Sequence, residues 1–181
     1  MFKEKDCLGE MEIREDVYYG IQTERARNNF AISGTTCDDL PEFIKAIAEV
    51  KKSAALANNK IGALDEKICN AICAAADEII SGKMRGNFPV DIFQGGGSTS
   101  TNMNVNEVIA KRANEILTGR KGYDAVHPNT HVNRGQSTND VIPTAIEITC
   151  YRYAVELKKS LEYLTAATAR KAEEFKTVVK T

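Results

Sequence analysis

The chain contains 181 residues, of which 43% are hydrophobic and 27% are charged, as is typical of a folded globular protein. Its formal net charge of −1 creates no overall field that would attract nucleic acid or an anionic membrane, so any bound anion must be held by local geometry. No apolar stretch approaches the ~20 residues of a membrane span, and the charged start Met1–Asp6 lacks the apolar core of a secretory signal.

The first half of the chain predicts two long helices. Within residues 10–35, Val17–Gly20 predicts a short strand or hairpin beside them. Over residues 41–61, apolar residues recur at steps of three and four, which indicates a helix with one apolar face. The segment 64–79 repeats this spacing, and the short connection before it predicts antiparallel neighbours. The expected inward-facing residues are Phe43, Ile47, Val50, Ala54, Ala57 and Ile61, then Leu64, Ile68, Ile72, Ala75 and Ile79.

Two further helices are predicted in the second half. One covers residues 103–117, with Gly119 as its stop. The longest begins near Asp140 and continues beyond Phe175, with Pro143 in its first turn, where backbone donors have no helical partner. The inward residues are Val105, Ile109, Ala113 and Ile116, then Ile142, Ile146, Tyr153, Leu157, Leu161 and Leu164. We therefore expect a mainly α-helical chain.

The five cysteines are odd in number and show no disulfide-like spacing, which favours a reducing, cytoplasmic location. Cys69 and Cys73 lie four apart and share one helix face, as metal ligands can. No other cysteine or histidine has zinc-like spacing with them, so two small apolar side chains in a helix contact is the preferred interpretation.

Two polar segments precede the last two predicted helices, at Phe93–Asn102 and Asn133–Asp140. Each places small hydroxyl and amide side chains before a helix N-terminus, where free N–H groups and the positive end of the helix dipole favour an anion. Two such loops suit a ligand with two carboxylates. The alternative is ordinary capping and turn formation by the same residue types.

Other kinds of site are less well supported. The glycines at 95–97 are not followed by Gly-Lys-Ser/Thr, so they are no phosphate-binding P-loop, and Ser100 stands where a dinucleotide fingerprint needs its last glycine. A Ser–His–Asp triad stays open, although nothing singles out His127 or His131. Pro128 lies between these two histidines and argues against a helical metal site.

The polar segments also carry a family resemblance. Gly95–Val108 resembles the first signature region of aspartases and class II fumarases, and His127–Asn133 followed by Gln136–Asp140 resembles the second. Tyr18–Thr23, together with Asn29–Phe30 and Ile32–Gly34, is similar to the family's amino-terminal stretch. The resemblance runs from about residue 8 to the end of the chain.

The resemblance implies a β-elimination that yields fumarate. Family members remove a proton beside one carboxylate and expel ammonia, water or another amine from the next carbon. The resulting aci-carboxylate is stabilised by prepositioned hydroxyl, amide and N–H donors, with no cofactor and no metal. By position, the substrate-binding residues are Thr99, Ser137, Thr138 and Asn139, with Ser100 and Thr101 as weaker candidates that equally fit capping. His127 and Asn129 resemble a second, non-catalytic dicarboxylate site of fumarases.

Within the family, Ser100 and Gln136–Asp140 favour aspartate ammonia-lyase, whereas His127–Pro128 resembles the fumarase version of that turn. Ser98 stands where glycine is usual and Thr130 where aspartate is usual, so the first loop and the second site depart from the family pattern.

The family's mobile Gly-Ser-Ser-x-Met-Pro-x-Lys-x-Asn-Pro loop, whose serine is the general base, does not occur in these residues. We therefore expect no catalytic residue here and an incomplete, inactive fragment. Residues 1–139 are expected to form the amino-terminal helical domain, and 140–181 the first helix of the central bundle. The resemblance implies a homotetramer with a small dicarboxylate substrate (aspartate or fumarate), no nucleic acid and no membrane. Class II fumarate hydratase and a non-catalytic oligomerisation or binding module are the alternatives.

Overall fold

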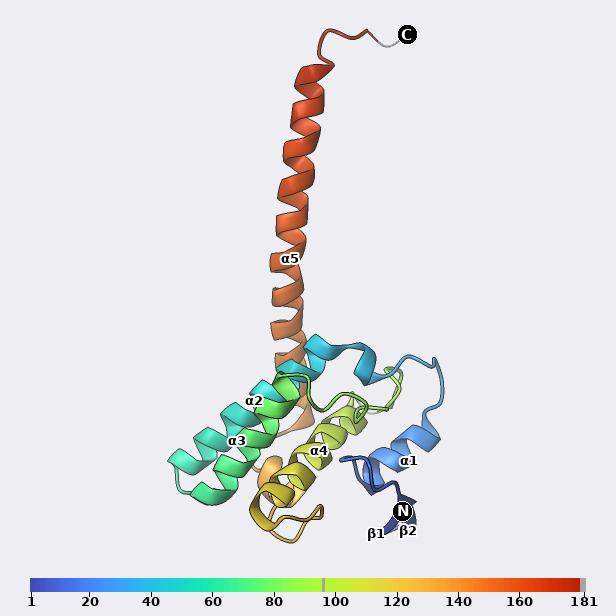
Figure 1. The fold of residues 1–181 in the computed structure, drawn as a ribbon, viewed down its shortest axis with the longest axis vertical. Coiled ribbons are helices and arrows are strands. Elements are labelled where there is room, and N and C mark those ends of the chain that lie inside the picture. The colour runs from blue at the N-terminus through green and yellow to red at the C-terminus, as the bar shows by residue number, and fades with distance from the viewer. Residues whose placement is uncertain (96, 180–181) are drawn as a thin grey trace. The chain divides into compact units, whose positions relative to one another are not determined.

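In the computed structural model, which describes residues 1–95 and 97–179, the mainly α-helical prediction is confirmed (Figure 1). The residues form two compact units, Met1–Ile146 and a second that begins at Glu147. The elements are β1 (Phe2–Asp6), β2 (Gly9–Ile13), α1 (Ile21–Asn29), η1 (Cys37–Asp39), α2 (Pro41–Lys60), α3 (Glu66–Ile80), α4 (Thr99–Thr118), η2 (Pro128–Val132) and α5 (Thr138–Glu174). No helix of the described residues is long and apolar enough to cross a membrane.

Helices α2, α3 and α4 form the core of the first unit. As predicted, α2 and α3 are neighbours joined by a short turn, and α4 packs against α3 (Figure 1). Asp65 caps α3 by accepting hydrogen bonds from the N–H groups of Lys67 and Ile68. Gly119, at φ 75°, ends α4 in the left-handed conformation that glycine adopts easily.

The buried face of α2 differs from the predicted one. Ile47 is buried, but Ala57 and Ile61 are exposed, and the face turned to the core instead includes Ile44, Ala48 and Lys51. This face follows the spacing 44, 48, 51, 55, so it passes through a charged residue that the apolar pattern skipped. In α3 the prediction is accurate, since Ile72, Ala75 and Ile79 are buried.

The predicted strand at Val17–Gly20 is wrong, because these residues form no regular structure. The hairpin lies earlier, where β1 and β2 pair antiparallel from Phe2–Ile13 to Asp6–Gly9. It is tied to α1 by Arg25, whose guanidinium contacts both carboxylate oxygens of Asp6 at 2.7 and 2.8 Å.

Buried Glu107 of α4 holds the start of α1. Its carboxylate accepts the backbone N–H groups of Gly20, Gln22 and Thr23 at 2.9–3.0 Å and the Thr23 hydroxyl at 2.6 Å. Burial raises the pKa of Glu107, while these hydrogen bonds lower it. The free N–H groups at the helix start and the carboxylate thus satisfy one another.

The long helix α5 begins two residues before the predicted start. Ile142 is buried, whereas Tyr153, Leu157, Leu161 and Leu164 are each more than half exposed. The apolar row predicted for α5 is therefore present, but in the second unit it is uncovered.

Candidate active site

The two polar segments meet at Asn102 of α4. Its side-chain amide lies 3.3 Å from the hydroxyl oxygen of Thr138, the first residue of α5, and 3.3 Å from the side-chain oxygen of Asn133. The N-termini of α4 and α5, each preceded by a polar loop, are thereby linked in one part of the first unit. Helix N-termini and neutral N–H and O–H donors can bind carboxylates.

The first loop is held by buried contacts. The Gln94 side chain donates to the Thr101 hydroxyl at 2.6 Å and accepts the Thr101 N–H at 2.8 Å. The Thr101 hydroxyl also lies 3.2 Å from the sulfur of buried Cys37. Thr101 therefore faces the interior and fixes the loop. Gly96, part of the predicted glycine run, lies outside the described residues.

Thr99 and Ser100 lie nearer the surface. Thr99 is exposed, and half-buried Ser100 lines an open pocket of about 560 Å³ with Gln22, Arg25 and Phe30. Just before them, Ser98 has a φ of 69°, the only positive value for a non-glycine among the described residues, and its side chain makes no capping hydrogen bond.

The second loop presents its polar residues at the start of α5. Ser137 and Asn139 are exposed and Thr138 is half-buried. The Ser137 hydroxyl oxygen accepts the N–H of Asn139 at 3.2 Å, so Ser137 caps the helix. Capping leaves the hydroxyl hydrogen of Ser137 available to a ligand.

The histidine segment forms a π-helical turn, η2, that His127 caps. The ring Nδ1 of exposed His127 accepts the backbone N–H groups of Asn129 and Thr130 at 3.2 and 3.3 Å. The backbone N–H of His127 donates to the ring Nδ1 of His131 at 2.9 Å. Burial, with the nearby His127 and Arg134, lowers the pKa of His131. The part of the chain that the structure describes contains no group of three or more His, Cys, Asp or Glu able to hold a metal ion.

Lys51 and Asn133 belong to the same cluster, although sequence reasoning gave neither a role. Lys51 donates to the side-chain oxygen of Asn133 at 2.8 Å. The available signal was a lysine in register with apolar Ile47 and Ala55 on one helix face.

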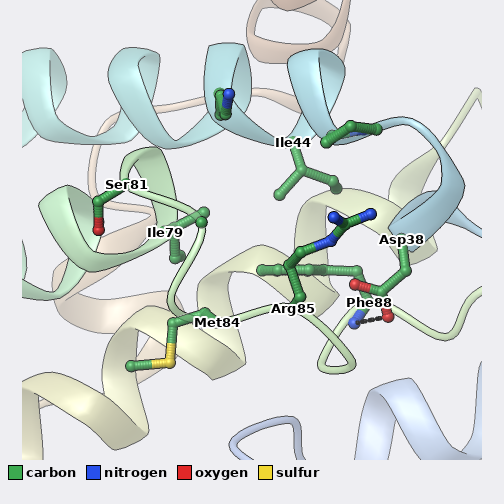
Figure 2. A pocket seen from close by; sticks show the side chains of 10 residues that line it. Asp38, Ile44, Ile79, Ser81, Met84, Arg85 and Phe88 are labelled. Carbon is green, nitrogen blue, oxygen red and sulfur yellow. Dashed lines mark hydrogen bonds between the residues drawn. The ribbon is translucent and has the colours of Figure 1, made fainter.

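Another pocket, of about 200 Å³, lies away from these candidate residues (Figure 2). Ile44 of α2, Ile79 of α3 and Phe88 form its apolar wall, and the N–H of Phe88 donates to Asp38 at 3.0 Å. It contains none of the residues that the sequence assigned to substrate.

Comparison with known proteins places the chain among lyases. A family model described as Lyase matches residues 9–181. The chain is 51% identical over 178 residues to an aspartate ammonia-lyase of Helicobacter pylori, and 52% identical to that of Bacillus subtilis. It is also 50% identical to a class II fumarate hydratase of Halobacterium salinarum. Each alignment covers 98% of this chain but only 37–38% of the relative, so the chain spans about two fifths of the length of these proteins.

Solved structures agree with the sequence relatives. The fumarate lyase:delta crystallin of Brucella melitensis superimposes with a TM-score of 0.92 and 46% identity, over 96% of this chain and 39% of that one. A class II fumarase of Schistosoma mansoni gives a TM-score of 0.76 and 37% identity over 82% of this chain and 31% of that one. The fold and the sequence together show that the chain belongs to the aspartase/fumarase superfamily of lyases.

Proposed function

We propose that this chain is the amino-terminal portion of an aspartate ammonia-lyase, which converts L-aspartate to fumarate and ammonia. The observation that carries the proposal is the contact of Asn102 with Thr138, which joins the two polar loops at the N-termini of α4 and α5. The aspartate ammonia-lyases among the relatives, at 51% and 52% identity, support the choice of reaction.

In this proposal Thr99 and Ser137–Asn139 bind the carboxylates and the amino group of the substrate. Removing the proton beside one carboxylate places a second negative charge on that group. Hydroxyl, amide and N–H donors fixed before the reaction stabilise this charge where it forms, without reorganising water. Ammonia then leaves from the neighbouring carbon. Ser100 and Thr101 are secondary candidates, and the engagement of Thr101 with Gln94 favours a supporting role.

We propose that these 181 residues do not turn over substrate by themselves. No segment resembling the family's base-carrying serine loop occurs in the sequence, and a general base must lie within hydrogen-bond reach of the proton it removes. The proposed assembly is a homo-oligomer, supported by the exposed apolar row of α5. A second dicarboxylate site at His127 and Asn129 stays a prediction.

Class II fumarate hydratase is the second candidate. The 50% identity to the Halobacterium salinarum enzyme and the His127–Pro128 turn favour it. A non-catalytic oligomerisation module is a third, and it would bind no dicarboxylate.

The deciding experiment measures fumarate formation by ultraviolet absorbance, from aspartate and from malate in parallel. It uses the complete gene product that carries this chain, with the 181-residue chain alongside. We expect turnover of aspartate, none of malate, and none of either by the 181-residue chain. Malate turnover would establish the hydratase instead. Fumarate binding without turnover of either substrate would contradict both enzyme proposals.

A further inference from the structure

Lys51 is a buried lysine whose hydrogen-bond partner is neutral. Its side chain has no exposed surface, and its Nζ donates to the amide oxygen of Asn133 at 2.8 Å. Burial lowers the pKa of Lys51 from 10.5 to about 7. A buried ammonium is unfavourable unless an anion balances it, so the position calls for an explanation.

Lys111, which among the described residues is likewise a lysine without exposed surface, has a carboxylate partner. Its Nζ lies 2.6 Å from a carboxylate oxygen of Glu4 and 2.6 Å from the backbone oxygen of Tyr19. Burial still lowers the pKa of Lys111, but Glu4 and Glu107 oppose the shift. Among the described residues, no carboxylate does the same for Lys51.

The elements packed against α2 are α3, α4, η1 and η2. Several acidic side chains of these elements, and His131, have other partners, and burial alone accounts for the lowered pKa of Lys51. These pairs are Asp77 with Lys52, Glu78 with Arg112, Glu107 with Thr23, Asp38 with the Phe88 N–H, Asp39 with Thr36, and His131 with the His127 N–H.

Asn133 connects Lys51 to the candidate substrate residues. The same Asn133 oxygen accepts hydrogen bonds from Asn102 and Asn106 at 3.3 and 3.2 Å, and the Asn102 amide also reaches Thr138. The side-chain amide oxygens of Asn102, Asn106 and Gln136 are buried without a hydrogen-bond partner among the described residues. The cluster thus has acceptors that these residues leave unused, which is rare for buried polar groups.

We propose that Lys51 is a positioning residue of the dicarboxylate site: through Asn133 its ammonium holds Asn102 and Thr138 in place, and its charge offsets that of the bound dianion. The inference rests on the proposed function, because it requires a dicarboxylate near Thr138. It explains why an otherwise apolar helix face retains a lysine that lacks a carboxylate partner.

The charge assignment has a measurable consequence. A nearby anion favours the ammonium form, so a bound dianion raises the pKa of Lys51 above about 7. Because binding and protonation are thermodynamically linked, fumarate binding at pH 7.5 takes up a fraction of a proton. Calorimetry of fumarate binding in phosphate and in Tris, whose ionisation enthalpies differ, measures that uptake.

The test uses the complete gene product as wild type, as Lys51→Met and as Lys52→Met. Methionine replaces the buried charge with an apolar chain of similar length, so we expect an unchanged or higher unfolding temperature for Lys51→Met. We also expect its fumarate affinity to fall on the order of tenfold or more, without proton uptake. Lys52, which pairs with Asp77 on the same helix, is the matched control, and Lys52→Met should bind as the wild type does.

A lower unfolding temperature with unchanged fumarate affinity and proton uptake in Lys51→Met would show a purely structural lysine and overturn the inference. If Lys51→Met fails to fold, the Asn133→Asp variant tests the inference instead. The new carboxylate pairs with Lys51 within the same shape, so the protein should stay folded, bind fumarate more weakly and take up no proton. Unchanged binding by Asn133→Asp would contradict the inference. Absence of fumarate binding and of turnover in the wild type would overturn the proposed function itself, a distinct result.

Discussion

Asn102 and Thr138 are 36 residues apart in the sequence, yet the amide of one lies 3.3 Å from the hydroxyl oxygen of the other. This contact joins the first turn of α4 to the first residue of α5. Two helix N-termini that each favour negative charge are therefore placed together.

Replacing Thr138 by valine removes the hydroxyl and keeps the shape of the side chain. In the complete gene product we expect kcat/KM for aspartate to fall by about 10²-fold, as for other lost donors to a developing oxyanion. Thr144→Val is the control, because the Thr144 hydroxyl only donates to the backbone oxygen of Asp140 on the same helix. Equal activity of the two variants would remove Thr138 from the site.

Gly20 has no room for a side chain. A Cβ there would lie 2.1 Å from the hydroxyl oxygen of Tyr123 and 2.8 Å from a carboxylate oxygen of Glu107. We expect Gly20→Ala to lower the free energy of unfolding by about 2–3 kcal/mol, measured by urea denaturation. A Cβ at Gly95 meets only Phe30, at 3.7 Å, so Gly95→Ala should cost less than about 0.5 kcal/mol. Similar losses in both variants would argue against the steric explanation.

Ser98 holds a left-handed backbone conformation that costs a non-glycine residue roughly 1–2 kcal/mol. Ser98→Gly relieves this strain, but glycine also raises the conformational entropy of the unfolded chain, which offsets part of the stabilisation. We expect a net increase of roughly 0.5–1 kcal/mol in the free energy of unfolding. The side chain makes no capping hydrogen bond, so no cap is lost. A destabilised Ser98→Gly protein would contradict the prediction.

Asp91 makes stability depend on pH in the acid range. Burial alone would raise its pKa, but hydrogen bonds from Phe93, Ser33 and Gly34 outweigh burial and hold the pKa at about 2, below the ordinary 3.8. The unfolded chain therefore binds more protons, and the stabilisation is present above pH 3.8 and lost as pH falls towards about 2. Urea denaturation of the wild type from pH 5 to pH 2 should show this loss, and Asp91→Asn should show a smaller one.

The apolar row of α5 should drive self-association of the 181-residue chain. Leu157 and Leu161 are 58% and 52% exposed and line one apolar groove of the helix with Ala154, Ala166 and Ala169. Leu161→Glu should therefore shift the sedimentation distribution towards monomer. Tyr163 is 75% exposed and lies outside this groove, so Tyr163→Glu is the control. A clean wild-type monomer at high concentration would refute the prediction.

The helices could be predicted from the sequence because their apolar spacing is strong. The start of α4 could not, since polar Thr99–Asn102 carries no apolar period. The hairpin was missed because β1 carries four consecutive charged residues, Lys3–Asp6, and so lacks the apolar alternation of a strand, and its attachment depends on the distant Arg25. The buried face of α2 was misplaced because it passes through Lys51, and a lysine becomes an interior residue only through tertiary contacts such as Asn133.

For the site, the motifs named Thr99 and Ser137–Asn139, but they could not show which hydroxyl groups point inward. The contacts of Thr101 with Gln94 and Cys37 arise from folding and have no local sequence signature. The same is true of Asn133, whose side-chain oxygen accepts hydrogen bonds from residues of α2 and α4.

The hydrogen bonds that Glu107 accepts from Gly20, Gln22 and Thr23 span 84–87 residues of sequence. During synthesis on the ribosome, the start of α1 is therefore made well before the carboxylate that completes its contacts. The Arg25–Asp6 pair, only 19 residues apart, can form early and keep the hairpin with α1. Such long-range contacts close slowly, and the unfinished amino-terminal segment exposes apolar surface meanwhile. Glu107 thus marks the point in translation before which the start of α1 cannot make its final contacts.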